Sequence, residues 1–179
     1  MPRSDFATHN LLAVSANARE PAINTAQTLD TTLLVAKGDV LQPAPRREPN
    51  KDEATGYREP DRVDDLGALV EGNFTFDKAQ PQHVALLASF ALGEVSSLAS
   101  GAGYIHTITP AAGDLDEDRS LPSFTALQRL GKTLGITRFP SCFVDQFSLS
   151  MQKDSWLKAT GNIKGTGKYD QVMTEEELT

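Results

Sequence analysis

Three histidines and a single cysteine are the side chains of this chain best suited to catalysis near neutral pH. His106 lies in the run YIHTITP, whose side chains alternate as in a strand. As a general base it would need a nucleophile such as Cys142 or Ser123 brought beside it by folding. The sequence favours two plainer interpretations: His106 forms a hydrogen bond within a sheet, and Cys142 is a small buried apolar residue.

Metal binding has little support in the sequence. His9 and His83 have no companions at a ligand spacing, and one cysteine cannot build a four-cysteine zinc site. The acidic run DLDED at 114–118 copies the first ligand positions of an EF-hand loop. However, Arg119 stands where that loop needs glycine, and Thr125 where it needs a bidentate glutamate. We expect an acidic surface loop and neither a metal nor a cofactor.

The glycine-rich stretch GNIKGTGK at 161–168 is similar to a phosphate-binding loop, but its spacing does not fit. That motif has four residues between its first glycine and the Gly-Lys pair, followed by serine or threonine. Here five residues separate Gly161 from Gly167, and Tyr169 takes the hydroxyl position. We expect a glycine-rich turn at the end of a strand. No pair of carboxylates stands out, so we expect no enzyme.

The composition argues against nucleic-acid and membrane binding. The 179 residues include 24 acidic and 17 basic side chains, a formal net charge of −7. This balance disfavours sequence-independent DNA binding and docking on anionic lipid, since both need clustered lysine and arginine. No apolar run approaches the roughly 20 residues that span a bilayer, and the N-terminus lacks the pattern of a secretory signal. We expect a soluble, single-domain protein made in the cytosol.

Alternation of apolar and polar side chains predicts a mainly β fold. A single helix is predicted to begin at Pro81 and to stop at Gly93. Because no other helix separates the strands, we expect an antiparallel two-sheet sandwich or barrel with this helix against a sheet. Ser96–Gly103 is interpreted as a small-residue loop, and Gln152-Lys153-Asp154 as the turn of a hairpin. The predicted strands are 31–37, 68–77, 104–109, 122–130, 141–151 and 155–163.

The segment 42–65 is the most unusual stretch of the chain. It carries four prolines, which we interpret as excluding any regular element, together with an even mixture of charges. Such long loops are usually functional or disordered. We therefore expect an N-terminal arm over 1–30, a β domain over 31–168 that contains the extended loop 42–65, and an acidic, fraying tail over 169–179.

The region from Leu66 to Lys168 resembles the tail tube, or major tail, proteins of long-tailed bacteriophages and related prophages. Three stretches carry the resemblance: LGALVEGNFTFDKAQPQHVALLASFALG, then YIHTITPAAGDLDEDRSLPSFTALQRLG, then FPSCFVDQFSLSMQKDSWLKATGNIKGTGK. The most distinctive part is LPSFT at 121–125. The likeness covers a little over half of the chain and leaves out the first 40 residues.

This resemblance implies a β-sandwich with one flanking helix whose copies join into rings, commonly hexameric. The rings would stack into a hollow tube through which DNA passes without specific binding. The implied partners are further copies and other tail proteins, with no membrane. The implied location is the virion tail, after synthesis in the bacterial host cytoplasm. Charges of the 42–65 loop could set the register between rings; the candidate interface residues are Arg46, Arg47, Glu48, Lys51, Asp52, Glu53, Tyr57 and Arg58.

Two other classes of function remain open. A non-catalytic β-sandwich binding module, or a virion accessory module, would stay monomeric or form one small oligomer, with 42–65 as its ligand-contact loop. A small barrel enzyme would use His106 together with an acid and would need a deep pocket around that histidine.

Overall fold

The computed structural model describes residues 10–36, 38–39, 41–49, 63–111, 121–131 and 135–172, which hold ten strands and one helix. The expected mainly β class with one helix is confirmed. In chain order the elements are β1 Asn10–Val14, β2 Thr31–Leu33, β3 Gln42–Pro49, β4 Val63–Phe76, α1 Pro81–Leu92, β5 Gly93–Ser100, β6 Gly103–Pro110, β7 Phe124–Leu130, β8 Gly135–Ser150, β9 Lys158–Gly165 and β10 Asp170–Val172.

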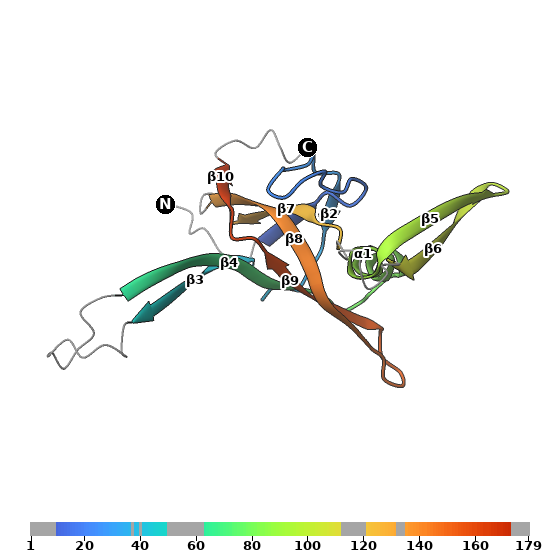
Figure 1. Cartoon of the computed structure of the whole chain (residues 1–179). Coiled ribbons are helices and arrows are strands. Elements are labelled where there is room, and N and C mark those ends of the chain that lie inside the picture. Colours follow the sequence, from blue (N-terminus) through green and yellow to red (C-terminus); the bar gives the residue numbers. More distant parts are fainter. Residues whose placement is uncertain are drawn as a thin grey trace, which may run out of the picture.

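The described strands pair only in the antiparallel sense, as expected (Figure 1). One sheet has the order β2-β1-β7-β8-β9-β4-β3, with β10 also on β8, and β5 pairs with β6 in a separate two-stranded ribbon. The first half of β8 pairs with β7 and β10, and its second half pairs with β9. Closure of the sheet into a barrel is not seen among these strands. β1 falls within the expected arm, and β10 within the expected tail.

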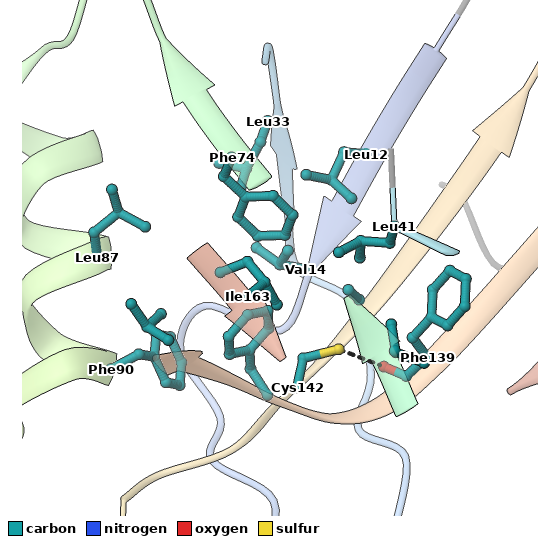
Figure 2. Packing of buried hydrophobic residues seen from close by; sticks show 14 of the residues in the cluster. Leu12, Val14, Leu33, Leu41, Phe74, Leu87, Phe90, Phe139, Cys142 and Ile163 are labelled. Atoms are coloured by element: carbon teal, nitrogen blue, oxygen red, sulfur yellow. Dashed lines mark hydrogen bonds between the residues drawn. The ribbon is translucent and has the colours of Figure 1, made fainter. Parts of the chain in front are cut away.

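The hydrophobic core lies where helix α1 meets the sheet. Figure 2 shows Leu87 and Phe90 of the helix facing Phe74, Val14 and Ile163 across this layer. The ring of Phe124 on β7 contacts two further rings, with centroids 4.8 Å from Phe90 and 6.1 Å from Phe74. Tilted aromatic pairs of this kind add to the free energy gained by burying the rings.

The predicted helix is confirmed at both ends. Pro81 occupies the first turn, where its missing N–H costs no hydrogen bond. Gly93 ends the helix in the left-handed conformation with φ 98°, and its N–H bonds the carbonyl of Ser89.

The expectation that prolines exclude a regular element from 42–65 is wrong for Gln42–Pro49. These residues form β3, in which Pro43 lies opposite Val70 and Pro45 opposite Ala68. β3 is an edge strand, and its pairing shifts between Pro45 and Arg47. Sheets tolerate proline at edges and bulges because the missing N–H there faces no partner strand. Residues 50–62 lie outside the described part of the chain.

The expected loop at Ser96–Gly103 is also a strand for most of its length. β5 runs to Ser100 and pairs residue by residue with β6 around a turn at Gly101. Small side chains gave no strand signal there, because the pairing depends on the backbone of β6 and not on local propensity.

The glycine-rich turn expected over 161–168 begins later than predicted. Gly161 and Gly165 lie within β9, and the chain turns only at Gly167, where φ is +87°. A Cβ added at Gly161 would lie 2.6 Å from Cδ2 of Leu87, which is fully buried. Gly161 is therefore the point at which the helix approaches the sheet backbone.

We expect Gly161→Ala to lower the free energy of unfolding by about 1–3 kcal/mol, because the added methyl group overpacks the contact with Leu87. The midpoint of urea unfolding measures this. Gly38→Ala is the matched control: its Cβ would meet no atom within 4 Å, so its effect should stay within about 0.5 kcal/mol. Equal midpoints for both variants would contradict the close approach of helix and sheet.

Candidate functional site

The ribbon of β5 and β6 projects away from the body of the protein (Figure 1). Leu98 and Ile105 are direct cross-strand partners and are 69% and 54% exposed. Tyr104, the residue before Ile105 in β6, is 71% exposed. Because neighbouring positions on a strand point to opposite faces, both faces of the ribbon carry exposed apolar side chains. A two-stranded ribbon without a core is marginally stable in water, so this surface suits contact with another chain.

Two other paired segments also extend beyond the core (Figure 1). One is the end of the β8–β9 hairpin, residues 149–156, called here the hairpin tip. Met151 and Trp156 of the hairpin tip are 77% and 69% exposed, and Lys78 Nζ lies 5.8 Å from the centre of the Trp156 ring. The other is the β3–β4 pair, on which Val63 and Leu66 are exposed.

Three of the predicted interface residues lie on β3. Arg46, Arg47 and Glu48 are exposed on this edge strand. Their role in an interface stays a prediction. The other five candidates lie outside the described residues: Lys51, Asp52, Glu53, Tyr57 and Arg58.

A groove of about 1050 Å³ lies between helix α1, strand β2 with the segment before it, and the β5–β6 ribbon. Its apolar lining comes from all three walls and includes Leu33, Phe90 and Val95. Arg19 and Glu94 add one charge of each sign. The groove is at the upper limit of small-molecule pockets, which measure about 300–1,000 Å³, so its size suits a polypeptide segment.

One carboxylate fixes the chain segment that forms a wall of this groove. Glu20 accepts hydrogen bonds from Ser123 Oγ at 3.0 Å and Thr125 Oγ1 at 2.5 Å. It also accepts from the N–H and the hydroxyl of Ser141, at 2.9 and 2.5 Å. Its own N–H bonds the carbonyl of Ser123. These contacts tie the segment after β1 to β7 and β8, and so they position Arg19.

The structure gives the predicted catalytic candidates separate structural partners. His106 Nδ1 lies 2.8 Å from the hydroxyl of Ser97, its cross-strand neighbour, which confirms the interpretation as a hydrogen-bonded histidine within a sheet. Cys142 is fully buried and donates to the carbonyl of Phe139 at 3.5 Å (Figure 2). Burial raises the pKa of the Cys142 thiol, which keeps it protonated and unreactive. Ser123 is bound to Glu20.

His83 lies at the start of α1, where it caps the helix. Its Nδ1 accepts the N–H of Gln80 at 3.2 Å, and its ring stacks on Phe76 with centroids 4.3 Å apart. Partial burial lowers the pKa of the His83 imidazole. The neutral ring is the form that can accept this hydrogen bond.

Among the described residues, no three His, Cys, Asp or Glu side chains are close enough to hold a metal ion. His9 and the acidic run 114–118 lie outside those residues. In the same part of the chain no helix has the length and apolar character needed to cross a membrane.

Sequence reasoning missed the exposed apolar side chains of the ribbon and of the hairpin tip, together with Glu20. Val95 and Leu98 are the large apolar residues of this stretch, but Ser96 and Ser97 stand between them and break the alternation that marks a strand. The residues near Glu20 in the sequence do not predict its structural role, because its hydrogen-bond partners are more than 100 residues away.

No protein-family model matches this sequence, and no curated protein matches it significantly. Among solved structures, the chain is similar to one in the cryo-EM structure of the anti-feeding prophage (AFP) baseplate, 6-fold symmetrised. The alignment covers 98% of each chain at 6% identity, with a TM-score of 0.48. At this TM-score the likeness assigns neither a fold family nor a function to the chain.

We expect Glu20→Gln to lower the free energy of unfolding by about 1–3 kcal/mol. The glutamine NH₂ group would face hydroxyl and N–H groups that donate to the carboxylate, and the negative charge that strengthens these hydrogen bonds would be lost. Chemical denaturation measures this loss of stability. Glu94→Gln, an exposed exchange of the same kind, should change the stability by less than about 0.5 kcal/mol. If Glu20→Gln were as stable as the unchanged protein, the carboxylate would not hold this segment.

The lowered pKa of His83 predicts a pH dependence of stability. The folded protein binds a proton at His83 less tightly than the unfolded chain does. The contribution of the neutral His83 ring to the free energy of unfolding is therefore complete above the unfolded pKa of about 6.5. It is lost as the pH falls below that value. Urea unfolding at several pH values should show a smaller loss on acidification in His83→Gln than in the unchanged protein. Equal losses in both proteins would contradict the assignment.

Proposed function

We propose that this chain is a structural subunit of a phage or prophage tail tube, self-assembling into stacked rings around a channel that conducts DNA. The observation that carries the proposal is the β5–β6 ribbon, whose exposed apolar residues have no core of their own. Fully burying a large apolar side chain is worth about 1.5–3 kcal/mol. Covering Leu98, Tyr104 and Ile105 with a second chain would therefore stabilise both the ribbon and the assembly.

The arrangement of the projecting segments supports an assembly of many copies. The ribbon, the hairpin tip and the β3–β4 pair extend from one small core (Figure 1), so one subunit can contact several neighbours. Different surfaces meeting head to tail generate rings when the rotation closes. The resemblance of Leu66–Lys168 to tail tube proteins is the reason for proposing a tail tube among the possible ring assemblies.

The net charge of the chain and the structural contacts of His106 and Cys142 agree with this proposal. A net charge of −7 favours a channel wall that repels DNA and lets it slide. We propose further copies and other tail proteins as partners, the virion tail as the location, and no catalytic role. The hydrogen bond between His106 and Ser97 and the burial of Cys142 support a structural use of these residues.

A non-catalytic binding or virion accessory module is the second candidate, and the groove beside α1 favours it. Such a module would use the groove for a foreign segment and would remain monomeric or form a small oligomer. The oligomeric state distinguishes the two proposals.

Negative-stain electron microscopy and sedimentation velocity over rising protein concentration test the tube proposal. We expect rings or tubes with a central hole. Leu98→Ser combined with Ile105→Ser should raise the concentration needed for assembly about tenfold or more, a loss of about 1.4 kcal/mol or more. Thermal unfolding of the monomer should hardly change, because both side chains are exposed.

The neighbouring cross-strand pair provides the matched control. Ser96→Ala with Thr107→Ala changes the same ribbon without removing apolar surface, and it should assemble like the unchanged protein. Dispersed monomers at every concentration would favour the binding module. Normal assembly of the Leu98 and Ile105 variant would overturn the role of the ribbon.

A further inference from the structure

The groove beside α1 combines apolar and charged side chains in its walls. Its walls combine aliphatic and aromatic side chains with Arg19 and Glu94, and both charged residues are exposed. Its volume of about 1050 Å³ fits a chain segment with one or two large side chains. A surface groove of this size and apolar character is typical of an interaction site.

The hairpin tip has matching properties. It presents Met151 and Trp156, the most exposed large apolar side chains of the β8–β9 hairpin. The turn between them carries Lys153 and Asp154, one charge of each sign. Tryptophan is enriched among the residues that dominate binding energy at protein interfaces.

We infer that the hairpin tip of one copy inserts into the groove of the next, with Trp156 and Met151 against its apolar walls. In this arrangement Lys153 pairs with Glu94, and Asp154 pairs with Arg19. Arg19 and Glu94 are exposed in the separate chain. This orientation of the hairpin tip avoids the two like-charge contacts that a reversed insertion would create.

The hairpin tip and the groove belong to different parts of the molecule. No residue of the hairpin tip lines the groove, and Figure 1 shows the hairpin and the ribbon extending in separate directions. Because the two surfaces are separate, each copy can use them with two different neighbours, and such a head-to-tail contact propagates into a ring or a filament. The inference rests on the proposed self-assembly and names the surfaces that perform it.

A charge exchange tests the pairing of Lys153 with Glu94. Lys153→Glu and Glu94→Lys should each raise the concentration needed for assembly about tenfold. Combining them should restore assembly, because the pair is re-formed with its signs exchanged. Lys153→Glu with Glu71→Lys has the same net charge but alters an exposed residue on β4 instead, so it should not restore assembly.

Disulfide trapping provides a second, independent measurement. The only native cysteine, Cys142, is buried and so does not interfere. Lys153→Cys protein mixed with Glu94→Cys protein should form a disulfide-linked dimer under mild oxidation, whereas Lys153→Cys mixed with Glu71→Cys should not.

The outcomes separate this inference from the proposed function. Assembly of the unchanged protein without rescue by the charge exchange and without the specific disulfide would overturn the insertion and leave the tube proposal standing. Failure of the unchanged protein to assemble at any concentration would overturn both. Rescue together with the specific disulfide would establish the insertion.

Discussion

Burial of apolar surface at the junction of α1 and the sheet is the interaction on which the rest of the structure depends. Phe74, Phe90 and Phe124 meet there, and Leu87 reaches the backbone at Gly161. Much of the chain lies beyond this junction, in paired strands that bury little apolar surface of their own. The β3–β4 pair and the β8–β9 hairpin remain ordered because their hydrogen-bond ladders continue from strands anchored in the core, whereas the β5–β6 ribbon is a separate sheet that follows directly from α1.

Strands β4 and β8 make this connection. β4 places Phe74 and Phe76 in the core while its other end, at Val63 and Leu66, is exposed. β8 likewise runs from buried Phe139 toward the hairpin tip. A continuous strand holds its far end at a defined position, which a contact surface needs, because ordering a loose segment on binding costs free energy.

The polar contacts of the described chain serve the same purpose. Glu20 joins the segment after β1 to β7 and β8, so that segment becomes a fixed wall of the groove. His83 caps α1, which forms another wall. His83, one of the side chains suited to chemistry, and Glu20, which the sequence did not indicate, are thus used to hold surfaces in place. This agrees with the proposal that the protein acts through its shape and its contacts.

Local chemistry in the sequence by itself determined the helix between Pro81 and Gly93, the strands with period two, the hairpin turn at Gln152-Lys153-Asp154 and the mainly β class. Each of these follows from the residues of the element itself. Only the tertiary structure decided that the proline-containing β3 and the serine-rich β5 are strands, that Gly161 faces Leu87, and that a groove lies beside α1. These features depend on partner backbones and side chains distant in the sequence, and local patterning does not encode those pairings.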